Sequence, residues 1–242
     1  MELTPLEKRT YIQLIQQRSM QAFTKMRQIA FIAGYDDTSK LRRIREICDE
    51  AFENRRKVII FSFYLDTIDR IRNCLKETVY GPITGSITPL KRQEIIDAFS
   101  AHAGGAVLLS QILAGGTGLN IQAASIVIMC EPQYKPSIEN QAIARSYRIG
   151  QNNNVTVYRL IGEKTVDERI LQVLKEKQAL FDAYADKSIS GESSLEVKES
   201  DIAAAEFTSS LMIEHDSKAV GSSKALENGS LFNAPSFSGK SI

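Results

Sequence analysis

The sequence predicts an α/β fold in which helices cover both faces of a parallel sheet. Short apolar runs rich in β-branched residues recur through the middle of the chain, beginning at residues 58–61. Such runs are typical of strands that are covered on both sides. Helical patterns separate the runs, and strands that alternate with helices over about 100 residues form βαβ units.

Helical periodicity precedes the predicted sheet. Residues 3–32 carry apolar side chains at helical spacing and predict one long helix that ends near Gly34. A second helix begins at residue 39, where Thr38 and Ser39 are candidate caps, and its apolar stripe predicts a core-facing position. We therefore distinguish an N-terminal helical segment, residues 1–38, from the lobe that follows.

The predicted lobe spans residues 39–163. Pro89 suits the first position of a helix because its fixed φ is already helical, and Thr88 can cap that helix. Strands are expected at residues 58–61, 79–84, 106–110, 125–130 and 155–161, with helices at 65–75, 90–99 and 137–149.

After the lobe, Thr165 and Glu168 have the spacing of a capping box, which opens a helix assigned to residues 164–187. Serine, glycine and other small residues dominate residues 188–242. That composition predicts a flexible tail, because it offers little apolar surface to bury.

Composition limits the classes of function. The chain has 242 residues and is 43% hydrophobic, which is enough for a real core. A net charge of +1 excludes a global basic field, so any contact with phosphate must be local. Cys48, Cys74 and Cys130 fit buried thiols in a reducing compartment, and two histidines give little support to a metal site. No stretch approaches the roughly 20 apolar residues of a membrane span, so we expect a cytoplasmic protein without membrane contact.

Small hydroxyl residues and glycines follow the predicted strands. The carboxyl ends of parallel strands share one edge of a sheet, where ligands of open α/β folds bind. Hydroxyl and backbone N–H groups offer donors to phosphate without bulk, although glycine loops are often plain turns and serines at strand ends are often caps. The candidates are Ser62, Gly85, Ser86, Ser110, and the loop at residues 114–120 with Gly116 and Gly118.

The stretch QAIARSYRIGQ at residues 141–151 places two guanidinium groups and an amide together. If it is helical, Gln141, Arg145 and Arg148 lie within an arc of roughly 60°. Such a face can grip phosphate, whereas two arginines three positions apart can also form an ordinary solvated face.

Five segments, taken in order, carry a resemblance to a known family. They are KVIIFSFY at residues 57–64, ITGSITPLKRQEIIDAF at 83–99, LLSQILAGGTGLNIQAAS at 108–125, CEPQYKPSIENQAIARSYRIGQ at 130–151 and VYRLI at 157–161. Together they resemble the second motor lobe of Swi/Snf-type ATPases of helicase superfamily 2, and their sequences are most similar to those expected of bacterial members. The resemblance covers residues 39–186.

The resemblance implies a motor of two RecA-like lobes with ATP in the cleft between them. The first lobe supplies the P-loop and the acidic pair that holds Mg²⁺, and the second supplies arginine fingers, which carry over onto Arg145 and Arg148. Double-stranded DNA and an N-terminal motor lobe, in cis or in trans, are the implied partners, with nucleoid association in a bacterium. By the same resemblance, Gly116, Gly118 and Gln141 lie on the nucleotide side, and Ser62, Gly85, Ser86 and Ser110 line the nucleic-acid track.

The chain departs from the family pattern at several points, which include Ala144 in place of a frequent aspartate and Tyr147 in place of a frequent histidine. It contains no GxxxxGK[ST] sequence, so we do not expect it to hydrolyse ATP alone. Ile112 and Leu113 stand where many members have a basic residue before the glycine loop. Two alternatives remain open: a non-catalytic RecA-like module that binds DNA or a protein, and a lobe of an RNA helicase.

Overall fold

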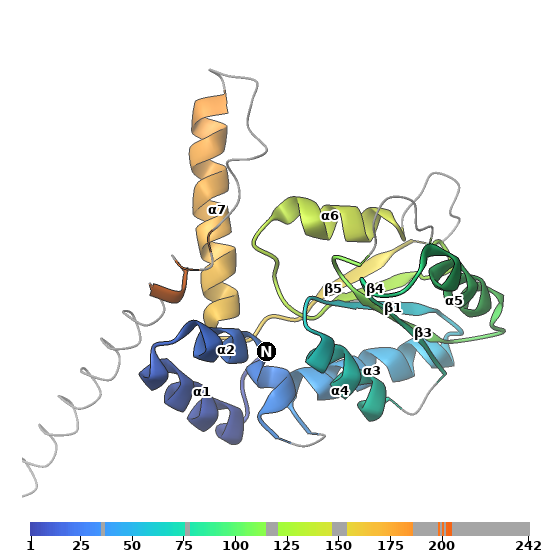
Figure 1. The fold of residues 1–242 in the computed structure, drawn as a ribbon, viewed down its shortest axis with the longest axis horizontal. Helices are drawn as coiled ribbons and strands as arrows, with labels where there is room; N and C mark the ends of the chain where they lie inside the picture. The colour runs from blue at the N-terminus through green and yellow to red at the C-terminus, as the bar shows by residue number, and fades with distance from the viewer. Residues whose placement is uncertain are drawn as a thin grey trace, which may run out of the picture.

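A five-stranded parallel sheet in the order β2-β3-β1-β4-β5 forms the centre of the protein (Figure 1). The computed structural model describes residues 1–34, 37–75, 78–114, 121–146 and 154–185, together with 198, 200 and 202–204. The predicted fold class is confirmed. The strands are β1 (Val58–Ser62), β2 (Val79–Ile83), β3 (Val107–Gln111), β4 (Ile126–Met129) and β5 (Thr156–Arg159).

Helices cover both faces of this sheet, as the continuous apolar strands require. Ile60 of β1 faces a core shared with α3 (Ser39–Glu53) and α4 (Leu65–Cys74). Its neighbour Ile59 faces the opposite core, shared with α5 (Pro89–Ala101) and α6 (Pro136–Ala144).

The predicted helix over residues 3–32 is wrong, because the structure has two helices there, α1 (Pro5–Gln17) and α2 (Met20–Ile32). Arg18 adopts the left-handed conformation with φ 45°, which ends α1. The Ser19 hydroxyl then accepts a hydrogen bond from the Ala22 N–H at 3.1 Å. A serine cap therefore starts a new helix within an unbroken apolar pattern.

The N-terminal helices form a third core with α7 (Val166–Ala185). Ile170 of α7 is fully buried there, while the distal half of α7 projects away from the other helices (Figure 1). Within the segment predicted to be a tail, Ile202 and Ala203 are buried in the same core. Most of that segment lies outside the described residues.

Acidic side chains cap two helices in ways that sequence spacing did not indicate. The Thr38 side chain makes no capping bond at α3; instead, the Ser39 N–H donates to the Glu7 carboxylate at 2.7 Å. At the start of α7, Glu168 accepts from the Lys164 N–H at 2.8 Å, one residue earlier than a standard capping box.

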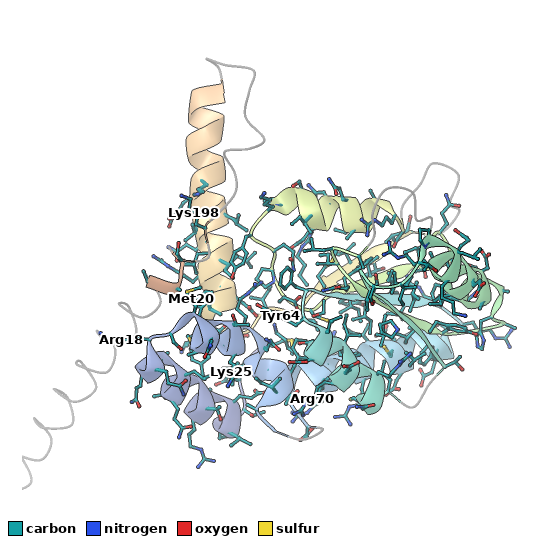
Figure 2. All side chains as sticks on the ribbon, in the orientation of Figure 1. Arg18, Met20, Lys25, Tyr64, Arg70 and Lys198 are labelled. Atoms are coloured by element: carbon teal, nitrogen blue, oxygen red, sulfur yellow. The ribbon has the colours of Figure 1, made fainter. Side chains whose placement is uncertain are left out.

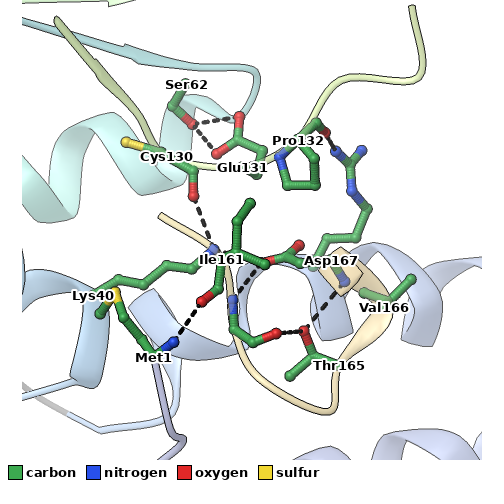
Figure 3. A network of polar contacts seen from close by, with 12 residues as sticks. Met1, Lys40, Ser62, Cys130, Glu131, Pro132, Ile161, Thr165, Val166 and Asp167 are labelled. Carbon is green, nitrogen blue, oxygen red and sulfur yellow. Dashed lines mark hydrogen bonds and ion pairs between the residues drawn. The ribbon is translucent and has the colours of Figure 1, made fainter. Parts of the chain in front are cut away.

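A buried ion pair joins α3, β4 and α7 (Figure 3). Lys40 Nζ lies 2.7 Å from Asp167 Oδ2 and donates to the Cys130 carbonyl at 2.8 Å. The Gly162 N–H also donates to Asp167 Oδ2, at 3.2 Å. The Lys40 and Asp167 side chains are 1% and 4% exposed, so water does not stabilise either charge. Each charge is stabilised mainly by the other.

Cys48, Cys74 and Cys130 are buried and form no disulfide, as expected. Burial raises the pKa of the Cys130 thiol well above its ordinary value, which makes this thiol unreactive. Across the described ranges, no helix combines the length and the apolar character needed to cross a bilayer.

We expect Lys40→Met to lower the free energy of unfolding by about 3–5 kcal/mol, because it leaves Asp167 charged and buried without its cationic partner. The control is Arg43→Met, which removes a solvent-exposed pair with Glu46 and should cost less than about 1 kcal/mol. Urea unfolding followed by circular dichroism measures both. The double variant Lys40→Met/Asp167→Leu should recover much of the loss. Equal losses in the Lys40 and Arg43 variants would contradict this account.

Candidate nucleotide and nucleic-acid interface

The carboxyl ends of the five strands meet at one edge of the sheet. Ser62 is in register with Gln111, and Phe61 with Ser110 and Met129. Ile83, two residues before Gly85, is in register with Ser110. The expectation that the candidates after β1, β2 and β3 share one edge is therefore met by the register.

Glu131 occupies the point where the sheet changes direction of winding. The chain leaves β1 toward α4 on one face and leaves β4 toward α6 on the other, so a crevice is expected between β1 and β4. The Ser62 hydroxyl lies 3.2 Å from both Glu131 carboxylate oxygens, and the Phe63 N–H donates to Glu131 Oε1. Burial raises the pKa of Glu131, although the Phe63 N–H and the nearby cations favour its charged form.

Arg27 closes the same crevice from the helical side. It comes from α2 and donates to the Tyr64 hydroxyl at 3.0 Å and to the Pro132 carbonyl at 2.5 Å. Its guanidinium carbon lies 4.4 Å from the centre of the Tyr134 ring, a cation–π contact. Figure 2 shows Tyr64 between the N-terminal helices and the sheet. The crevice that often receives a ligand in this fold class is thus filled by the chain's own side chains.

The two candidate serines at strand ends are buried. Ser62 and Ser110 are each 1% exposed. Ser62 bonds to Glu131, and the Ser110 hydroxyl donates to the Gln111 carbonyl at 3.2 Å. In this conformation their hydroxyls stabilise the edge from inside, and their predicted contact with nucleic acid stays a prediction.

Gly85 and Ser86 are exposed, unlike those serines. The Arg92 guanidinium donates to the carbonyls of Thr84 and Gly85 at 3.1 and 3.2 Å, which fixes the turn. The turn leads directly into α5, whose capping residue Thr88 accepts from the Lys91 N–H at 3.4 Å. An exposed turn at a helix N-terminus offers N–H and O–H donors and a favourable dipole to a phosphate group.

Helix α6, whose C-terminal cap is Arg145, is anchored at its beginning. Glu139 accepts from Arg159 Nε at 2.8 Å and from the Gln133 N–H at 3.3 Å, which ties α6 to the end of β5. Gln141 is exposed on this helix. The regular helix ends at Ala144 with Arg145 as its cap, earlier than the predicted residue 149.

Arg145 lies at the far end of α6, where its carbonyl accepts from the Ile121 N–H at 3.0 Å. A nine-residue helix is about 13 Å long, so the start of α6 lies near the carboxyl edge, as expected for a helix that follows a strand, and Arg145 lies farther from it. The Arg145 side chain is half-buried, and burial lowers its pKa, although a guanidinium stays cationic at neutral pH.

The structure thus brings four candidates to one edge and leaves two on a separate helix. Ser62, Gly85, Ser86 and Ser110 share the edge; Gln141 and Arg145 lie on or next to α6. Gly116, Gly118 and Arg148 fall outside the described residues. Within those residues, no group of three or more His, Cys, Asp or Glu side chains could hold a metal ion.

Sequence reasoning missed the buried charges at this edge. Glu131 follows a buried strand, which is a signal for a residue at the carboxyl edge, but the sequence does not show that Ser62 and the Phe63 N–H are its partners. Arg27 belongs to a helical pattern in which a buried arginine cannot be told from an exposed one.

Residues 39–150 match the family model described as the helicase conserved C-terminal domain. The chain carries a helicase C-terminal domain of the SWI2/SNF2 type. Its sequence is 40% identical over 147 residues to an "Uncharacterized ATP-dependent helicase" of Mycoplasma pneumoniae, covering 60% of this chain and 14% of that protein. The helicase C-terminal domain therefore spans only a small part of the length of such relatives.

Solved structures agree with this assignment. The C-terminal domain of a SWI2/SNF2 ATPase from Sulfolobus solfataricus is similar, with a TM-score of 0.58 and 25% identity, covering 83% of this chain and 92% of that one. The ATPase core from the same organism, in complex with double-stranded DNA, gives a TM-score of 0.60 and 26% identity over 76% of this chain and 44% of that one. The helicase C-terminal domain thus has a RecA-like fold.

We expect the stability difference between the wild type and Glu131→Gln to depend on pH. Because burial raises the folded pKa of Glu131, the folded protein holds this proton more tightly than the unfolded chain does. Wild-type stability should therefore fall relative to the variant as the pH rises from about 4.3, the ordinary glutamate pKa, through the raised folded value. Urea unfolding at several pH values measures this, with exposed Glu94→Gln as the control. A wild-type advantage that grows with pH over this interval would refute the assignment.

Proposed function

We propose that this chain is the second motor lobe of an ATP-dependent, Swi/Snf-like DNA translocase and that it requires an N-terminal P-loop lobe for activity. The observation that supports the proposal has two parts: side chains fill the crevice between β1 and β4, and Arg145 lies away from that crevice, at the end of α6. Glu131 and Arg27 fill the switch point between β1 and β4, and the sequence contains no Walker A loop. A nucleotide then needs residues from another lobe.

Arg145 is the finger that the described part of the chain offers to such a nucleotide. A half-buried guanidinium has fewer waters competing for its charge than an exposed one, so it interacts more strongly with developing negative charge. In other NTPases an arginine finger accelerates hydrolysis by about 10³ to 10⁵. Arg148 is proposed as the second finger, and Gln141 as a residue that positions the arginines or contacts nucleotide.

The absent lobe is proposed to supply the phosphate-binding loop and the acidic pair for Mg²⁺. The helicase C-terminal domain has cationic side chains that can pair with phosphate. Its described residues include no group of three or more His, Cys, Asp or Glu that could hold a metal ion. When bound, ATP and Mg²⁺ supply the phosphoryl group and its neutralising ion. The role proposed for this chain is to complete the pocket by contributing Arg145 and Arg148, with Gly116 and Gly118 allowing close approach of the loop.

Double-stranded DNA is the proposed track. The exposed turn at Gly85 and Ser86, held by Arg92 beside the N-terminus of α5, has the donors that a phosphate backbone needs. Ser62 and Ser110 are proposed to reach the track only if the edge rearranges, since both are buried here. The similarity to a SWI2/SNF2 core bound to double-stranded DNA supports this choice of nucleic acid.

We expect the chain alone to show no ATP hydrolysis and to become active when an N-terminal SWI2/SNF2 lobe with a P-loop is supplied. In that reconstituted system, Arg145→Ala should lower the kcat of DNA-stimulated hydrolysis by about 10³. Arg145→Lys should recover little of it, because an ammonium cannot reproduce the planar fork of donors.

The matched control is Arg43→Ala, an exposed arginine on α3 that should leave kcat unchanged. Comparing duplex DNA with single-stranded RNA as stimulators separates a DNA motor from an RNA helicase. Hydrolysis unaffected by Arg145→Ala and by Arg148→Ala would rule out the finger assignment, whereas duplex DNA binding without any hydrolysis would point to a non-catalytic module.

A further inference from the structure

A cavity of about 700 Å³ lies at the amino-terminal edge of the sheet, opposite the edge described above. Its walls come from segments that are distant in sequence: the turn between α3 and β1, the end of α5, and the residues that lead into β4 and β5. Arg55, Arg56 and Lys57 come from the first of these, and His102 from the second. We refer to it as the amino-edge cavity.

The described residues that line the amino-edge cavity include three cations and no carboxylate. Arg55, Arg56 and Lys57 contribute three positive charges, and the other described lining residues include the amides Asn54 and Asn154. Within the part of the chain that the structure describes, no carboxylate forms an ion pair with any of the three cations. Three like charges around one hollow repel one another unless an anion enters.

Two of the cations are held in place by neutral acceptors. Arg56 donates from Nε to the Ser125 hydroxyl at 3.0 Å and from Nη2 to the Ser125 carbonyl at 2.9 Å. Lys57 Nζ donates to the Ser100 carbonyl at 2.6 Å, and burial lowers the pKa of Lys57. These bonds orient the charged groups before any ligand arrives, which reduces the cost of ordering them on binding.

Arg55 does not serve the fold in the same way. Its side chain forms no hydrogen bond or ion pair with the described residues, and its backbone has φ 52°, which favours glycine or asparagine over arginine. His102 is also oriented, since its Nδ1 lies 3.1 Å from the Tyr80 hydroxyl. An arginine at a backbone position that favours glycine or asparagine is explained if its positive charge binds a ligand.

We propose that the amino-edge cavity binds a phosphate-bearing anion of about nucleotide size through Arg55, Arg56 and Lys57. Its volume lies within the range of about 300–1,000 Å³ that is usual for small-molecule sites. The anion is either a free phosphate compound or a phosphate of a nucleic-acid backbone. The site is separated from the carboxyl edge by the length of a five-residue strand, about 16 Å, and is independent of the proposed ATP cleft.

The test compares two pairs of charge-removing substitutions in the full chain. Arg55→Asn/Lys57→Gln removes two cavity charges, and asparagine tolerates the left-handed backbone at residue 55. Arg43→Gln/Lys91→Gln removes two exposed charges elsewhere and changes the net charge equally. Thermal unfolding checks that both variants are folded.

The readout is the imidazole NMR signal of His102 in a His215→Gln background, where it is the only histidine left. Inorganic pyrophosphate should shift this signal, and its Kd should weaken by about tenfold or more in the cavity variant but less than about twofold in the control. A response to short duplex DNA alone, with a salt slope reduced by about two in the cavity variant, also supports the site and identifies the backbone as the source.

Absence of a His102 response to both probes, or equal weakening in the two variants, would overturn the proposal. Neither result bears on the arginine fingers, because the variants leave Arg145 and Arg148 intact. Conversely, loss of ATP hydrolysis in Arg145→Ala with normal pyrophosphate binding leaves this site standing.

Discussion

The ion pair between Lys40 and Asp167 is the constraint on which the arrangement of the protein depends. It holds a cation of α3 and an anion of α7 2.7 Å apart in the buried interior. Lys40 also donates a hydrogen bond to the carbonyl of Cys130, which follows β4. The cost of desolvating both charges offsets much of their attraction, but removing either one leaves the other buried without a counter-charge, which strongly destabilises the fold. The pair therefore ties the start of α7 to the sheet, and α2 packs against both, with Phe31 in the core beside the strands.

That arrangement determines which surface remains for function. With α2 held against the sheet, Arg27 and Tyr64 fill the space beside Glu131 with the chain's own side chains. Among the candidate residues that the structure describes, Gly85, Ser86 and Gln141 are exposed and Arg145 is half-buried. This distribution of buried and exposed residues supports the proposal that the lobe contributes side chains to a pocket formed by another lobe.

Most of the fold could be predicted from the sequence, because apolar periodicity reports directly on burial. β1 was placed from its continuous apolar run, and α5 from Thr88 and Pro89 at its start. The break at Arg18 and Ser19 was not predicted, since a cap inside an unbroken pattern competes with helix continuation by a small free energy. The pairing of Lys40 with Asp167 could not be predicted, because the two residues are 127 positions apart and no local sequence pattern relates them.

The candidate site was predicted less completely than the fold. Residue types at strand ends indicated the edge, but not that Ser62 and Ser110 are buried while Gly85 and Ser86 are exposed. The central claim is that Arg145 completes a nucleotide pocket formed by another lobe. A crystal or cryo-electron microscopy structure of this chain with a P-loop lobe, duplex DNA and a γ-phosphate mimic measures it directly. The claim predicts the Arg145 guanidinium within hydrogen-bonding distance of the mimic, about 3 Å; Arg145 turned away into an internal carboxylate pair would contradict it.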